Sequence, residues 1–193
     1  MNRRQMMMLT LPLIAVPGAL MAQATAPAAP PKAKAKAAYD PAPTEVPIRD
    51  GFEVGSIVVV SGDYYLYHVI APGRAIRYGV AVGKDELVWK GRALIGRKVE
   101  WPSWTPTAEM IKRKPEQYGK YKDGMPGGPQ NPLGARALYL HTEGGNDTAI
   151  RIHGTTDPSS IGRSVSNGCI RMRNEAVMDL FDKVPIGTPV YVY

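Results

Sequence analysis

Short runs of β-branched and aromatic residues, each closed by turn residues, dominate the chain after Ser56. Residues 57–60 are Ile-Val-Val-Val, and further runs of this kind lie at 64–70, 75–82, 92–100, 137–141, 148–153 and 190–192. Such runs favour strands, and the Ser-Gly-Asp, Pro-Gly and Gly-Gly-Asn-Asp segments between them favour tight turns. The pattern therefore predicts a mostly β domain, a small β-sandwich or barrel.

Two stretches depart from the strand pattern. Residues 102–132 are rich in Pro, Gly, Trp and Tyr, with a short helix expected near 107–113. An irregular stretch of this length inside a compact domain typically forms a lid or a binding wall. Near the end of the chain, apolar residues at helical spacing predict a short C-terminal helix that Asn174 caps and that stops at 185–187. Its core-facing residues are expected to be Val177, Leu180, Phe181 and Val184.

The first 47 residues do not have the composition of a folded domain. Residues 1–24 combine Arg3 and Arg4 with an apolar stretch and end in Ala-Gln-Ala, the three parts of a cleavable signal peptide. The apolar run is too short and too interrupted for a stable transmembrane anchor. Residues 25–47 are rich in Ala, Pro and Lys, which predicts a disordered linker. Residues 48–193 then form one domain, exported to a bacterial periplasm, with Sec export favoured over the twin-arginine route.

The formal net charge of +7 is compatible with nucleic acid, an anionic membrane surface or an anionic polymer such as a cell wall. Nucleic acid is disfavoured, because the linker lysines lack interleaved aromatic residues and export removes the usual partner. His68 and His141 lie on expected strands without a pair of ligands at zinc-like spacing, so neither a metal nor another cofactor is expected.

Cys169 is the only cysteine, so no disulfide can form within the chain. It lies in the segment Ser-Asn-Gly-Cys-Ile-Arg-Met, sixteen residues after His153. A nearby imidazole commonly activates a thiol, and Gly168 permits a tight turn whose N–H groups can stabilise an oxyanion. Taken singly, however, such a histidine or buried cysteine is more often structural than catalytic.

Together, His-Gly-Thr at 153–155 and Ser-Asn-Gly-Cys-Ile-Arg-Met at 166–172 closely resemble the signature of L,D-transpeptidases of the YkuD type. These are enzymes of the bacterial cell wall, similar to the ErfK, YbiS, YcfS and YnhG proteins. The resemblance covers most of 51–193 and includes the tryptophan-proline segment at 101–106 and residues 125–134. It implies that 48–193 form the L,D-transpeptidase catalytic domain, which is mostly β.

The resemblance also implies a chemistry. Cys169 would attack the carbonyl between a diamino acid and the terminal D-alanine of a peptidoglycan stem tetrapeptide. His153 would carry the proton to the departing D-alanine, and the backbone carbonyl of Gly154 would orient the imidazole. The N–H groups of Asn167, Gly168 and Cys169 would form the oxyanion hole. Many members have His where this chain has Asn167, a departure that bears on pocket polarity rather than on the catalytic base.

Five residues are candidates for substrate binding: Arg171, Ser166, Trp101, Trp104 and Tyr118. Arg171 suits a substrate carboxylate because its guanidinium is a fixed positive fork. An ion pair between Arg171 and an acid of the protein is an equally good interpretation. For the three aromatic residues, ordinary packing and a wall of the donor site are likewise equal alternatives.

The acceptor of the acyl group is not determined by these residues. An amine of a second stem would give a cross-link, and an amine of an envelope lipoprotein or outer-membrane protein would anchor that protein to the cell wall. Water as acceptor would make the chain an L,D-carboxypeptidase or hydrolase with the same site. A non-catalytic cell-wall binding module is the remaining alternative, and it would not require a Cys-His pair.

Overall fold

The computed structural model of this protein describes residues 39–193. The expected signal peptide, 1–24, and residues 25–38 of the expected linker lie outside this range. The strands are β1 (Thr44–Pro47), β2 (Ile57–Val60), β3 (Tyr65–Ala71), β4 (Arg74–Gly79), β5 (Val82–Gly83), β6 (Gly91–Glu100), β7 (Arg136–His141), β8 (Asp147–His153), β9 (Ser164–Ser166), β10 (Ile170–Arg171) and β11 (Pro189–Val192). The helices are α1 (Ala108–Arg113), α2 (Pro115–Tyr118) and α3 (Asn174–Lys183), with 3-10 turns η1 (Ser61–Asp63), η2 (Asp85–Leu87), η3 (Gly119–Tyr121) and η4 (Pro158–Ser160).

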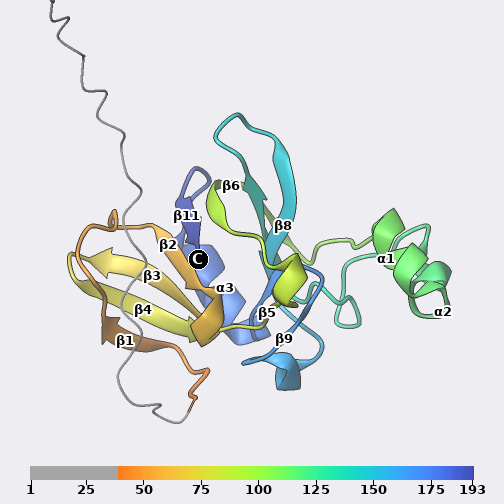
Figure 1. The fold of residues 1–193 in the computed structure, drawn as a ribbon, viewed down its shortest axis with the longest axis horizontal. Coiled ribbons are helices and arrows are strands. Elements are labelled where there is room, and N and C mark those ends of the chain that lie inside the picture. Colours follow the sequence, from red (N-terminus) through yellow and green to blue (C-terminus); the bar gives the residue numbers. More distant parts are fainter. Residues whose placement is uncertain (1–38) are drawn as a thin grey trace, which may run out of the picture.

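Nine strands form one mixed sheet in the order β1-β4-β3-β2-β11-β6-β7-β8-β10, and β5 pairs with β9 in a second, small sheet (Figure 1). Within the large sheet β11 runs parallel to β2 and β10 runs parallel to β8, whereas the other neighbours are antiparallel. The last strand of the chain therefore joins the β1–β4 half to the β6–β10 half. The prediction of a mostly β fold with a short C-terminal helix is confirmed.

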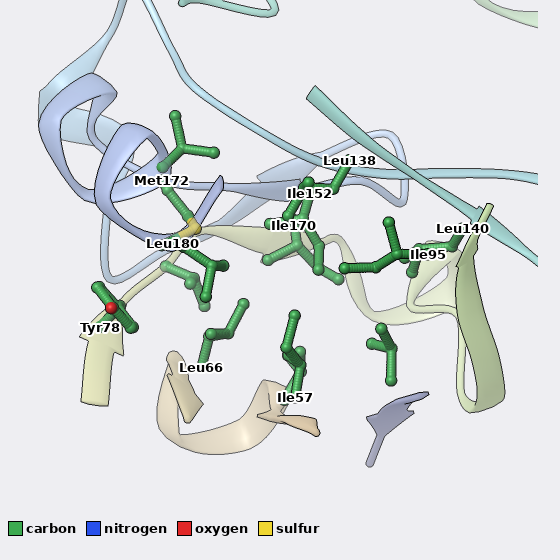
Figure 2. Packing of buried hydrophobic residues seen from close by; sticks show 14 of the residues in the cluster. Ile57, Leu66, Tyr78, Ile95, Leu138, Leu140, Ile152, Ile170, Met172 and Leu180 are labelled. Atoms are coloured by element: carbon green, nitrogen blue, oxygen red, sulfur yellow. The ribbon is translucent and has the colours of Figure 1, made fainter. Parts of the chain in front are cut away.

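Strand β2 lacks polar alternation because both of its faces are buried. Ile57 and Val59 belong to the main core, and Val58 packs with Phe52 and Val69 in a smaller cluster. The main core collects side chains from both halves of the sheet and from α3, as Figure 2 shows. Its largest fully buried members include Tyr78, Ile57, Leu66, Ile95, Leu138, Leu140, Ile152, Met172 and Leu180.

Helix α3 lies against β7 and β8, and all four of the core residues predicted for it are buried. At its C-terminal end, Lys98 Nζ of β6 donates to the carbonyl oxygens of Phe181 at 2.6 Å and Val184 at 2.8 Å. The predicted cap at its N-terminal end is wrong. Asn174 is the first residue of the helix, and the N-cap position is Arg173, which makes no side-chain cap bond. The Asn174 amide instead bonds two neighbouring segments of backbone.

The end of the expected linker is part of the fold. Residues Thr44–Pro47 form β1, which pairs antiparallel with β4 at the edge of the large sheet. Tyr39 stacks on Tyr65 with ring centroids 5.1 Å apart, and Arg74 of β4 forms an ion pair with Glu45. The alternation of Thr, Glu, Val and Pro in β1 is too short to have indicated a strand from sequence, and its pairing with β4 supplies the stabilisation that its own composition lacks.

Residues 102–132 leave the sheet after β6 and return before β7, and their helices stand apart from the strands (Figure 1). Thr107 caps α1 by accepting a hydrogen bond from Met110 N–H, so the helix expected near 107–113 is confirmed. Trp104 pairs through its backbone with Met125, which closes the segment at its base. Within residues 39–193, no helix has the length and apolar character needed to cross a membrane.

Candidate active site

The two motifs singled out from sequence meet on adjacent strands. His153 is the last residue of β8, and Cys169 directly precedes β10. The parallel register places Arg171 opposite His153 and Ile170 opposite Ile152, and Met172 N–H donates to His153 O at 2.8 Å. Strand β10 is only two residues long, and besides its pairing with β8 its Arg171 forms a bridge with Ala81.

The imidazole of His153 is held by the backbone. Its side chain is buried, and Nδ1 lies 2.6 Å from the carbonyl oxygen of Gly154. Because a carbonyl oxygen can only accept a hydrogen bond, Nδ1 carries the proton in this contact. Nε2 of neutral His153 is therefore the basic nitrogen.

Burial controls the charge of His153. Desolvation, together with the positive charge of Arg171, lowers the pKa of His153 from 6.5 to about 4. Hydrogen bonding of the protonated ring to the backbone of Gly154 and Leu133 opposes that shift. The imidazole is consequently neutral at pH 7 and able to accept a proton.

The thiol of Cys169 lies over the edge of β8. Its Sγ is 3.9 Å from the carbonyl oxygen of Ala149, a residue whose φ of 61° interrupts the regular strand. Desolvation raises the pKa of Cys169, whereas the backbone N–H of Arg151 and the guanidinium groups of Arg151 and Arg171 act against that shift. At pH 7 the Cys169 thiol and the His153 imidazole are therefore both neutral.

A serine hydroxyl shapes the turn that carries the cysteine. Buried Ser166 donates from Oγ to Cys169 O at 2.5 Å and accepts from Gly168 N–H at 3.1 Å. Gly168 has a φ of +117°, which other residues rarely adopt. Its N–H is thus already bonded, while among residues 39–193 the N–H groups of Asn167 and Cys169 have no hydrogen-bond partner. The hydroxyl of Ser166 lies inside the turn.

Arg171 lies beside the site without a carboxylate of its own. Its backbone bonds Ala81 in both directions, at 2.8 and 2.9 Å. Among the described residues no acidic side chain forms an ion pair with its guanidinium. The alternative interpretation of Arg171, an ion pair with an acid of the protein, therefore has no support in residues 39–193.

The three aromatic candidates lie directly after β6 or within the segment 102–132. Trp101, just after β6, is 46% exposed and has a φ of 44°. Trp104 packs edge-on against Tyr118 and Tyr121, with centroids 6.2 and 5.8 Å apart, inside the segment 102–132. That segment reaches the cysteine turn through Arg113 of α1, whose Nη2 donates to Asn167 Oδ1 at 3.0 Å.

Several neighbours of the site were missed by the sequence analysis. The Ala149 carbonyl and the Arg151 N–H face the thiol, and the Leu133 carbonyl faces the imidazole. Arg151 had a signal, because it lies two residues before His153 and so shares its face of a predicted strand. Ala149 and Leu133 act only through their backbone carbonyls, which leave no trace in residue type. In residues 39–193 no three His, Cys, Asp or Glu side chains are grouped so that they could hold a metal ion.

Comparison with protein families gives one matching family model, YkuD, described as the L,D-transpeptidase catalytic domain, over residues 55–192. A putative L,D-transpeptidase from the ATP synthase subunits region of Fuscovulum blasticum is 44% identical over 110 residues, 56% of this chain and 52% of that protein. The probable L,D-transpeptidase YbiS of Escherichia coli is 40% identical over 110 residues, 56% of this chain and 33% of that protein. The chain thus spans between a third and about half of the length of these relatives.

Two solved structures are also similar to this chain. A Brucella melitensis protein, described as a probable carnitine operon oxidoreductase, is 51% identical with a TM-score of 0.55, and the match covers 79% of this chain and 92% of that one. An L,D-transpeptidase from Enterococcus faecium is 18% identical with a TM-score of 0.54, over 73% of this chain and 50% of that one. At this low identity the second structure is evidence of a shared fold.

Proposed function

Because the chain belongs to the YkuD family of L,D-transpeptidase catalytic domains, we propose that it is a peptidoglycan L,D-transpeptidase with Cys169 as its nucleophile. The observation that carries the proposal is the docking of the Cys169 turn beside a neutral His153 whose Nδ1 is bonded to Gly154 O. This arrangement favours acyl transfer over the oxidoreductase activity named for the Brucella melitensis relative, since it joins a thiol to an oriented base.

In the first half of the reaction, Sγ attacks the carbonyl carbon between the diamino acid and the terminal D-alanine of a stem tetrapeptide. The thiol proton passes to His153 Nε2 as the C–S bond forms. The N–H groups of Asn167 and Cys169 stabilise the oxyanion, and such a donor is typically worth on the order of 100-fold in rate. The C–N bond then breaks, and Nε2 returns its proton to the departing D-alanine.

In the second half, an acceptor amine attacks the thioester carbon and gives its proton to Nε2. The C–S bond breaks, an amide forms, and the proton returns to Sγ. An amine from a second stem gives a cross-link, and an amine from an envelope lipoprotein or outer-membrane protein anchors that protein to the wall. Water in the same place makes the reaction hydrolysis, as in an L,D-carboxypeptidase.

We assign substrate binding to the side of the site on which Arg171 lies. Arg171 is the candidate partner for a stem carboxylate, supported by its lack of an ion pair within residues 39–193. Trp101 is exposed at the start of the segment 102–132, where it is available to a ligand. Trp104 and Tyr118 contribute to binding indirectly, because their contact stabilises this segment. Arg113 links the segment to the cysteine turn through its hydrogen bond to Asn167. Ser166 contributes by fixing the cysteine turn.

The reaction takes place outside the cytoplasmic membrane in this proposal. The support is residues 1–24, which have the charged, apolar and cleavage regions of a signal peptide and lie outside the described residues. A periplasmic location gives the enzyme access to peptidoglycan stems. The proposed reaction requires no cofactor.

Incubation of the purified chain with disaccharide-tetrapeptide, followed by mass spectrometry, tests the proposal. A cross-linked dimer that has lost one D-alanine is the expected product. A tripeptide alone would show hydrolysis instead, and unchanged tetrapeptide would indicate a binding module.

Replacement of the nucleophile supplies the site-specific test. Cys169→Ala should abolish the loss of D-alanine, because no other thiol is present in the chain. Ser159→Ala, which changes an exposed hydroxyl on the neighbouring loop, should retain the wild-type rate. Product formation by Cys169→Ala would refute the assignment of the nucleophile.

A further inference from the structure

The side chain of Asn174 bridges two backbone segments next to His153. Its Oδ1 accepts hydrogen bonds from Ala135 N–H at 3.1 Å and from Thr155 N–H at 3.3 Å. Ala135 directly precedes β7, and Thr155 follows β8 by two residues. Asn174 therefore joins the start of α3 to the backbone that flanks the catalytic histidine.

One of these bonds acts on the peptide group that orients the imidazole. The carbonyl of Gly154 and the N–H of Thr155 belong to the same planar trans peptide and point in opposite directions. On one side, Gly154 O receives the hydrogen bond from His153 Nδ1 at 2.6 Å. On the other side, Thr155 N–H is bonded to Asn174 Oδ1. Rotation of this peptide would break both contacts together.

The backbone around the Asn174 amide fits closely against its oxygen. A Cβ at Gly134 or at Gly154 would lie 2.2 Å from Asn174 Oδ1. Gly134 has a φ of +67°, and its Cβ would also lie 2.6 Å from Thr155 N. Two glycines thus leave the space that the amide oxygen fills.

The direction of the Gly154 carbonyl decides which nitrogen of His153 is basic. With Nδ1–H bonded to the carbonyl, Nε2 carries the lone pair that takes the thiol proton. In the other tautomer Nε2 carries a hydrogen and cannot act as the base, and loss of the group that holds the correct tautomer has cost a serine protease about 10⁴-fold in rate. A group that holds the carbonyl therefore acts on catalysis without touching the substrate.

We propose that Asn174 is a positioning residue that fixes the Gly154–Thr155 peptide and thereby the tautomer and direction of His153. The catalytic part of this inference rests on the proposed transpeptidase function. The tautomer part concerns the folded chain alone, so the two can be tested separately.

The test compares three variants with the wild-type chain. Asn174→Leu keeps a similar shape and removes the acceptor, whereas Asn174→Asp keeps an oxygen at the Oδ1 position. Glu175→Ala changes the neighbouring exposed residue in the same helical turn and serves as the control. If Asn174→Leu does not fold, Asn174→Ala replaces it, because it removes the acceptor and adds no bulk.

The first readout is the ¹⁵N spectrum of the imidazoles, with the His153 signals identified from a His153→Gln sample. Wild type, Asn174→Asp and Glu175→Ala should show His153 protonated at Nδ1. Asn174→Leu, or Asn174→Ala in its place, should show exchange between the two tautomers. A folded acceptor-free variant with the wild-type His153 signature would overturn the proposal, whatever its activity.

The second readout is release of D-alanine from the tetrapeptide. The acceptor-free variant should lose about 10- to 100-fold, the range typical when a residue that orients a metal-binding histidine is removed. Asn174→Asp should recover most of that loss. Absence of activity in the wild-type chain would refute the transpeptidase function while leaving the spectral test of Asn174 intact, and full activity in an acceptor-free variant would refute the positioning role.

Discussion

At the scale of single residues, the site buries an imidazole that would be partly protonated near neutral pH if it were exposed to water. His153 is 4% exposed, and the cost of placing a charge there lowers its pKa to about 4. Arg171 adds to this effect, although the same guanidinium also favours the thiolate form of Cys169. The same cation therefore favours loss of the thiol proton and disfavours a charged imidazole.

The buried imidazole should make stability depend on pH. The unfolded chain binds a proton at His153 below about 6.5, whereas the folded chain binds it only below about 4. The stabilisation from this group is therefore complete above pH 6.5 and is lost as the pH falls toward 4, by about 3 kcal/mol in total. Urea unfolding at pH 7 and pH 4.5 should show this loss in wild type and a smaller one in His153→Gln. An identical pH dependence in the two chains would contradict the lowered pKa.

At the scale of elements, α3 is fixed at both ends by residues that come from elsewhere in the chain. Lys98 of β6 bonds two carbonyls at its C-terminal end and lies 4.3 Å from the centroid of the Phe181 ring. In the middle, Tyr78 of β4 donates to Asp179 at 2.7 Å. The helix thus connects the two halves of the sheet, and its first residue contacts the backbone of the site.

Removal of the two hydrogen bonds from Lys98 to the end of α3 should destabilise the fold. Lys98→Met keeps the length of the side chain and leaves the last carbonyls of α3 without their donor, at a cost of about 1 to 3 kcal/mol. Chemical denaturation would measure this loss, with Lys90→Met, an exposed lysine before β6, as the matched control. Equal stability of the two variants would argue against a stabilising role for the Lys98 hydrogen bonds.

At the scale of the whole molecule, the sheet is assembled from segments far apart in sequence. Strand β11 pairs with both β2 and β6, and β1 extends the sheet on the outer side of β4. The folded unit therefore begins before residue 48. Its edge includes the ion pair between Arg74 and Glu45 and the stacked rings of Tyr39 and Tyr65.

Truncation tests where the folded unit begins. A chain of residues 39–193 should unfold at a higher temperature than a chain of 48–193, because the shorter chain loses β1 and the contacts of Tyr39. Loss of about 2 kcal/mol corresponds to a decrease in Tm of about 5 °C for a domain of this size. Calorimetry of the two chains measures the difference, and equal Tm values would show that β1 does not contribute.

Local patterns in the sequence were sufficient for the elements with strong signals. The β-branched run of β2, the turn residues between β7 and β8 and the apolar spacing of α3 predicted those elements, and the two motifs predicted the family. Strands β1, β9 and β10 were missed because each is short and is stabilised by pairing rather than by its own composition.

The sequence by itself determined the strand-rich class and the family, and it predicted Cys169 and His153 as the reacting pair. Tertiary structure alone decided which nitrogen of His153 is basic, which N–H groups of the cysteine turn remain available, and where Asn174 directs its amide. These depend on backbone atoms that every residue shares, and their positions follow from the packing of β8, β10 and α3 rather than from local residue preference.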